Sequence, residues 1–103
     1  MRSRETISWI FLALAIASKE ESVDYAEISE IADGINHSVP TLKEMETSIL
    51  WLKRKKLILT GGNKFALSES GKKIYNETAE ESKQLFKMKK IIEDKIRLQI
   101  QNI

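Results

Sequence analysis

The sequence predicts a mainly α-helical fold with one small β-hairpin, and three observations support this prediction. Apolar residues recur at helical spacing in three segments of the first half of the chain. Two short aliphatic runs then flank a glycine turn, which is the pattern of a hairpin. One proline and four glycines among 103 residues leave room for long helices, and this length suits a single domain. The predicted order is three helices, a hairpin and a final helix.

The first predicted helix runs from about Arg4 to Ser18 and is apolar on nearly every side. Its apolar residues form two adjacent stripes, with Ile7, Ile10, Phe11, Leu14 and Ala17 in one and Trp9, Leu12, Ala13 and Ile16 in the other. A helix of this kind must be covered on nearly every side. Because one layer of a small domain cannot do so, the sequence predicts a second covering surface from a partner.

This segment also has the outline of a short signal peptide, with Arg2 and Arg4 ahead of an apolar run over 7–17. Glu5 in the charged part and Trp9 in the apolar part oppose that alternative, and the run is too short to span a bilayer. The chain has no cysteine, which excludes a disulfide scaffold, thiolate metal sites and thiol catalysis. We therefore expect a cytoplasmic location.

The second predicted helix has strong start signals. Asp24 can cap it, Glu27 stands three residues further on, and Val23 can pack against Ile28 across the cap. Gly34 lies where a glycine commonly ends a helix. The predicted buried face consists of Ile28, Ile31, Ala32, Ile35 and either Tyr25 or Ala26.

Thr41 and Glu44 form a second capping box, at the start of a third helix that ends near Lys55 or Lys56. The predicted inward stripe of this helix is Leu42, Met45, Ile49 and Leu52, with the place of Trp51 left open. Helical geometry then turns the following side chains outward: Lys43, Glu46, Thr47, Leu50 and Arg54.

The hairpin is predicted from two strands, Leu57–Thr60 and Lys64–Leu67, joined by the turn Gly61-Gly62-Asn63. Ser68 can cap the final helix. After a polar stretch over 76–84, apolar residues return at Leu85, Met88, Ile92, Ile96 and Ile100. This apolar end should dock on the second stripe of the first helix, in the same subunit or in another.

One longer segment, from Ile28 to Tyr75, reads I-x-x-I-A-D-G-I, a turn, T-L-K-E-M-E-T-S-I-L-W-L-K-R-K-K-L-I, a hairpin and A-L-S-E-S-G-K-K-I-Y. It resembles the winged helix-turn-helix domains of small bacterial transcription regulators. The resemblance implies a winged-helix domain over residues 1–78, extended by a C-terminal dimerisation helix over residues 79–103. Lys56 stands where that superfamily commonly has a left-handed glycine, at an expected cost of about 1 kcal/mol.

The function implied by this resemblance is that of a homodimeric DNA-binding transcription regulator, with double-stranded DNA and a second copy as partners. The expected DNA-binding residues are Ser38, Thr41, Lys43, Thr47, Arg54, Lys55, Asn63 and Lys64. The expected dimer interface consists of Trp9, Leu12, Ile16, Leu85, Met88, Ile92, Ile96 and Ile100. The alternative is a winged-helix protein–protein interaction module without DNA binding.

Charge is distributed unevenly along the chain, although the formal net charge is only +2. The segment Glu20–Asp33 holds six acids and no base, whereas Lys53–Lys73 holds seven bases against the single acid Glu69. A domain with this asymmetry can present its basic face to phosphate. Bases at the end of the third helix also complement the helix dipole, so both interpretations stay open.

No catalytic motif is found, and an enzyme is not expected. His37 is the only histidine and has no cysteine or carboxylate cluster at metal-ligand spacing, so we expect a turn histidine that bonds to backbone. The Gly61-Gly62 pair joins two strands and is not a phosphate-binding loop. We expect no cofactor, metal ion or membrane partner, and an effector ligand stays unknown.

Overall fold

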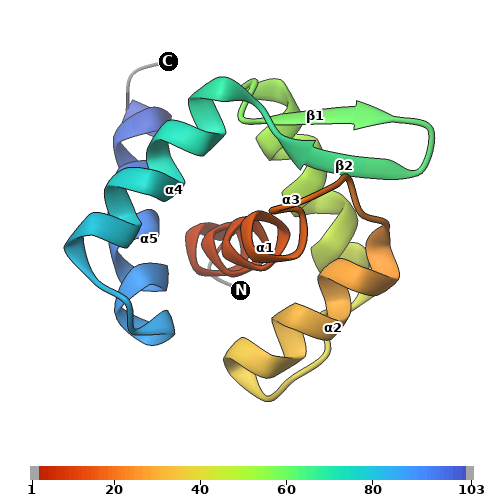
Figure 1. Ribbon diagram of the computed structural model, residues 1–103, viewed down its shortest axis with the longest axis horizontal. Coiled ribbons are helices and arrows are strands. Elements are labelled where there is room, and N and C mark those ends of the chain that lie inside the picture. Colours follow the sequence, from red (N-terminus) through yellow and green to blue (C-terminus); the bar gives the residue numbers. More distant parts are fainter. Residues whose placement is uncertain (1–2, 102–103) are drawn as a thin grey trace.

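The computed structural model describes residues 3–101, and over that range the protein is mainly helical with one two-stranded antiparallel sheet (Figure 1). The elements are, in order, α1 (Ser3–Ala17), α2 (Tyr25–Asn36), α3 (Leu42–Arg54), β1 (Ile58–Gly61), β2 (Lys64–Leu67), α4 (Glu69–Glu81) and α5 (Leu85–Gln101). This order agrees with the predicted one except at the C-terminal part, where two helices replace the single helix predicted. No helix in the described range has the length and apolar character needed to cross a membrane.

α1 runs through the middle of the protein, with the other helices and the hairpin arranged around it (Figure 1). Every side chain from Thr6 to Ala15 is buried. Trp9 Nε1 donates a 2.8 Å hydrogen bond to the carbonyl of Ala32, which orients α1 against α2. The cover for the second apolar stripe therefore comes from the same chain.

The chain turns back between α4 and α5, where a single continuous helix was expected. α4 ends at Glu81, Ser82 is extended, and the Ser82 hydroxyl accepts a 3.1 Å hydrogen bond from the amide of Gln84. No proline or glycine marks this turn in the sequence. The turn lets the apolar side of α5 reach α1. The predicted boundary between the domain and its C-terminal helix, after residue 78, falls inside α4 and not at this turn.

The eight residues predicted to form a dimer interface do not make one exposed surface. Five of them are buried within the single chain: Trp9, Leu12, Met88, Ile92 and Ile96. Ile16 is half-buried, Leu85 is 41% exposed, and the side chain of Ile100 lies outside the part that the structure describes. α5 covers much of α1 within the same chain, whereas Leu85, Phe86 and Leu98 of α5 are exposed, and pairing with a second copy stays a prediction.

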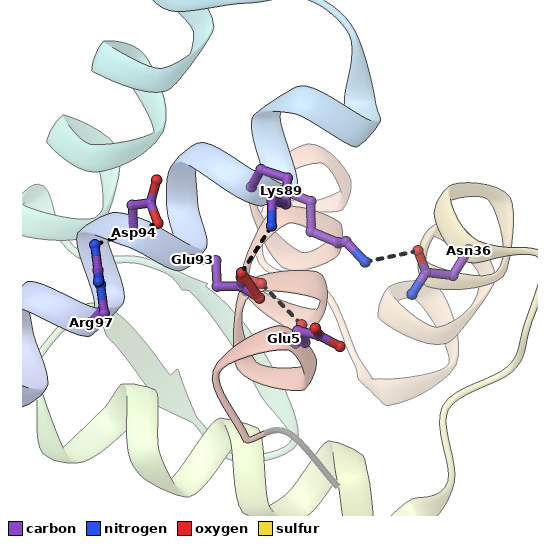
Figure 2. A network of polar contacts seen from close by, with 8 residues as sticks. Glu5, Asn36, Lys89, Glu93, Asp94 and Arg97 are labelled. Carbon is purple, nitrogen blue, oxygen red and sulfur yellow. Dashed lines mark hydrogen bonds and ion pairs between the residues drawn. The ribbon is translucent and has the colours of Figure 1, made fainter.

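Polar side chains on the exposed sides of α5 contact the neighbouring helices α2 and α4 (Figure 2). Lys89 reaches α2, where its Nζ donates a 3.5 Å hydrogen bond to Asn36 Oδ1. Lys95 pairs with Glu77 and Glu81 of α4 at 3.7 and 3.5 Å. Exposed contacts of this kind contribute at most about 1 kcal/mol each. Burial of the apolar side of α5 therefore contributes most to the docking of this helix on the rest of the chain.

Both predicted capping boxes are present. Asp24 Oδ1 accepts a hydrogen bond from the amide of Glu27 at 3.0 Å, and Glu27 Oε1 accepts one from the amide of Asp24 at 3.1 Å. The bond from the Glu27 amide lowers the pKa of the Asp24 carboxyl. Thr41 and Glu44 make the same exchange at the start of α3. Sequence reasoning finds these helix starts because both partners lie within three residues of each other.

The end of α2 differs from the prediction. The helix continues past Gly34 to Asn36, and His37 ends it in the left-handed conformation with φ 55°. The amide of His37 donates a 2.7 Å hydrogen bond to the carbonyl of Asp33. His37 thus takes the place that was assigned to the glycine, and histidine is among the residues that tolerate this conformation more readily than most.

The buried stripe of α3 consists of Met45, Ser48, Ile49 and Leu52. Leu42 was predicted to belong to it but is 65% exposed. As the first residue of α3, Leu42 lines a shallow furrow together with Tyr25 and Pro40 instead of reaching the core. Trp51 is half-buried at the edge of the stripe.

The hairpin is present, but β1 begins and ends one residue later than predicted, so Gly61 pairs with Lys64 and the turn is Gly62-Asn63. The hairpin also has one additional contact. β1 and β2 pair with Thr60 opposite Phe65, and Gly62 in the turn adopts the left-handed φ of 60° that a tight hairpin requires. Val23 and Phe65 exchange two amide-to-carbonyl hydrogen bonds, at 2.9 and 2.7 Å. The sequence did not predict this bridge, which attaches the hairpin to the segment that precedes α2.

α3 ends in a Schellman motif. The amide of Leu57 donates to the carbonyl of Leu52, and the amide of Lys56 donates to that of Lys53, both at 3.0 Å. Lys56 adopts the left-handed conformation with φ 60°, as expected from its place in the sequence. A residue with a Cβ is strained in this conformation, whereas glycine is not.

We expect Lys56→Gly to raise the free energy of unfolding by about 1 kcal/mol, because the left-handed strain is relieved. The reciprocal change, Gly62→Ala, introduces the same strain at φ 60° and should lower the free energy of unfolding by a similar amount. Urea unfolding followed by circular dichroism measures both changes. Equal and same-signed shifts in the two variants would contradict the assignment.

Candidate nucleic-acid interface

The outward face of α3 carries a regular stripe of four exposed side chains: Lys43, Thr47, Leu50 and Arg54. Their spacing of four, three and four residues places them in one line along the helix, opposite its buried stripe. At 1.5 Å per residue the line is about 16 Å long. A cation stands at each end, and the two middle positions are a threonine and a leucine. We call these four residues the α3 stripe.

The N-terminal end of α3 is exposed, but its hydroxyl groups are not all free. Ser38 lies in the connection that precedes the helix and is exposed. The hydroxyl of Thr41 accepts the amide hydrogen of Glu44 at 3.0 Å, so the capping box uses it. The Glu44 carboxylate also lies at this end, where it occupies the amide-rich terminus that would otherwise attract an anion.

The basic run at the end of α3, Lys53–Lys56, contains both exposed and half-buried side chains. Lys53, Arg54 and Lys56 are exposed. Lys55 is half-buried, and its Nζ lies 5.7 Å from the centre of the Trp51 ring. This cation–π contact directs Lys55 to the side of the helix. Of the predicted DNA-binding residues in this run, Arg54 is therefore better placed than Lys55.

The turn of the hairpin lies close to the start of α2. Asn63 is exposed in the turn, and Lys64 Nζ lies 3.8 Å from Glu27 Oε1, with both side chains about half exposed. This pair neutralises one acid of the acidic α2 at the edge of the candidate interface. The contact is too exposed to contribute much stability, but it sets the local charge.

Tyr25 is a member of this surface that sequence reasoning treated only as a candidate for burial. Its ring stacks on Phe65 of β2, with centroids 5.1 Å apart and planes 3° from parallel. Burial and the nearby Glu46 carboxylate raise the pKa of the Tyr25 hydroxyl above its usual value. The contact depends on the hairpin folding back on α2, which no local pattern predicts.

A furrow of about 330 Å³ separates α3 from the hairpin beside this stack. It is lined by Tyr25, Glu46, Ile49, Leu50, Lys53, Thr60, Gly62 and Phe65. Glu46, which was predicted to face outward, is exposed but lies on the furrow side of α3. Leu50 of the α3 stripe lines the same furrow, so Glu46 borders the stripe on the side of the hairpin.

Other chemistry has little support over the described residues. No group of three histidine, cysteine, aspartate or glutamate side chains within residues 3–101 is placed to hold a metal ion. His37 lies in the left-handed turn after α2. Of the predicted DNA-binding residues, Lys43, Thr47 and Arg54 lie in one line on α3.

Comparison with known proteins adds no assignment. No family model, curated protein or solved structure matches the chain. The fold and the exposed surface of α3 are therefore the features from which the function of the protein is inferred.

Proposed function

We propose that the protein binds double-stranded DNA through α3, as a winged-helix transcription regulator. The α3 stripe is the observation that carries this proposal, because an exposed helical face about 16 Å long can enter a major groove about 12 Å wide with a cation at either end. The order of three helices and a hairpin supports it.

Each part of the surface has a role in this proposal. Lys43 and Arg54 contact phosphates on the two sides of the groove, and Thr47 reaches a base edge between them. Asn63 at the hairpin turn contacts the backbone beside the groove. Ser38, exposed before α3, is a further phosphate contact. Pairing with a second copy stays a prediction, since five of the residues expected at its interface are already buried within the single chain.

The double variant Lys43→Ala/Arg54→Ala tests this proposal. We expect its affinity for duplex DNA to fall at least tenfold at about 50 mM salt, where phosphate contacts are strongest. The slope of log affinity against log salt should decrease in magnitude by about 2, one unit for each lost contact. Fluorescence anisotropy with labelled genomic fragments measures both quantities.

A matched control removes two exposed lysines of α5 and its approach, Lys83→Ala/Lys87→Ala, for the same change in net charge. This variant should retain the affinity and the salt slope of the unmodified protein. If both double variants lose affinity equally, general charge and not the α3 stripe is responsible. If the unmodified protein binds no duplex at about 50 mM salt, the proposed function is wrong.

A second candidate function, docking of another protein, is favoured by apolar residues around α3. Val39, Leu42, Leu50 and Leu59 are large apolar side chains that the fold leaves exposed. Capture of one partner in fixed stoichiometry, combined with no salt-sensitive affinity for DNA, would favour this alternative. Loss of that capture in Leu42→Ala would connect the partner to the α3 surface.

A further inference from the structure

We infer that the α3 stripe reads DNA sequence mainly through the methyl groups of thymine, with Leu50 as the residue that determines specificity. This inference rests on the proposed function and specifies how it operates. Its basis is the chemistry of the two middle positions of the stripe, where the helix would approach the bases most closely.

The middle of the stripe offers little hydrogen-bonding capacity for base recognition. Bidentate recognition of guanine requires arginine or lysine, and that of adenine requires asparagine or glutamine. The cations of the stripe stand only at its ends, and between them lie Thr47 and Leu50. Thr47 offers one hydroxyl and one methyl group, whereas Leu50 offers methyl groups alone.

Leu50 is available for this contact and is not needed by the core. It is 48% exposed, and helical geometry places it opposite the buried stripe. Thymine is the base that presents a methyl group in the major groove, so it is the natural apolar partner for a leucine there. Contact with this methyl group removes apolar surface from water on both sides.

The surroundings of Leu50 favour a base over a phosphate as its partner. Lys53 and Arg54 follow it at three and four residues, and Lys43 lies two turns earlier. These cations would hold the backbone on both sides and keep the leucine at the centre of the groove. Glu46 lies four residues before Leu50 and lines the same furrow, so an acid borders the leucine on the hairpin side and would repel a phosphate there.

The experiment begins with the full chain and a pool of random duplexes. The tightest-binding duplexes are enriched, sequenced and resynthesised with deoxyuridine in place of each thymine in turn. This substitution deletes one methyl group and retains every hydrogen-bonding group of the base. At the thymines that Leu50 contacts, we expect the affinity to fall about fourfold for each methyl group.

Leu50→Ala should bind the thymine and deoxyuridine duplexes with equal affinity. The matched control is Leu98→Ala on α5, since Leu98 is 56% exposed and lies outside the α3 stripe. This control should retain the full preference for thymine. Both substitutions are at exposed positions, and a thermal melt followed by circular dichroism checks that each variant folds.

The outcomes separate this inference from the proposed function. Binding to enriched duplexes with no change on deoxyuridine substitution, or with a change that Leu50→Ala retains, overturns the inference and leaves DNA binding intact. Binding without any sequence enrichment also overturns it. If no duplex binds, the proposed function is wrong and the inference falls with it.

Discussion

Replacing Gly71 by alanine is expected to destabilise the protein by about 3 kcal/mol or more, a large part of the stability of a small domain. A Cβ at this position would lie 2.1 Å from the carbonyl oxygen of Leu57 and 3.4 Å from Cβ of Leu67. The first of these atoms is backbone, so no rotation of a side chain can relieve the overlap. Urea unfolding followed by circular dichroism gives the change in free energy.

The close approach at Gly71 has a structural purpose. Near it, the amide of Ser68 donates to the carbonyl of Leu57 at 3.0 Å, and the Ser68 hydroxyl donates to the carbonyl of Lys56 at 2.7 Å. The start of α4 is thus bonded to the segment between α3 and β1. A side chain at residue 71 would separate these two segments and weaken both bonds.

Gly34→Ala is the matched control for this prediction. Gly34 also lies within a helix, but no atom lies within 4 Å of the position that its Cβ would occupy. Alanine should therefore stabilise the protein here by about 0.5–1 kcal/mol, through its better helix propensity. A Gly71→Ala variant that is as stable as Gly34→Ala would contradict the packing of α4 on the start of β1.

Truncating Ile92 to alanine is the second change with a large expected effect. Ile92 is completely buried between α5 and α1. Removing its side chain should lower the free energy of unfolding by about 2–5 kcal/mol, through lost burial and the cavity that remains. Leu98→Ala, on the same helix but 56% exposed, should change it by no more than about 0.5 kcal/mol.

The same measurement tests where α5 docks. If α5 covers α1 within one chain, the unfolding midpoint of the unmodified protein should not depend on protein concentration. If α5 instead docks on a second copy, the midpoint should rise with concentration, because association then stabilises the fold. A rise across a hundredfold range of concentration would contradict the intramolecular docking and restore the predicted dimer.

The features that sequence reasoning predicted well are those that depend on near neighbours. The capping boxes at Asp24 and Thr41 require only residues three positions away. The glycine turn of the hairpin requires only the local backbone, whereas the left-handed Lys56 was expected from the resemblance to winged-helix domains. The outward residues of α3 follow from the helical period once the buried stripe is recognised.

Other features differ from the local inferences or were not predicted at all. Gly34 does not end α2, and the helix stops instead at the left-handed His37. Leu42 fits the inward period of α3 but lies in its first turn, where it lines a furrow at the surface. The Val23–Phe65 bridge joins residues 42 positions apart, so no local pattern indicates it.

The sequence by itself determined α1, α2 and α3, the start of α4, the hairpin and the apolar surface on α1 and α5, but not the break between α4 and α5. Only the tertiary structure decided how that apolar surface is covered, because a pattern of buried residues does not say which chain provides the cover. The turn at Ser82 allows α5 to fold back on α1, so part of that surface is covered within the chain, and pairing with a second copy stays a prediction. The same packing leaves the α3 stripe exposed, since burial of one face of a helix determines which side chains remain on the other.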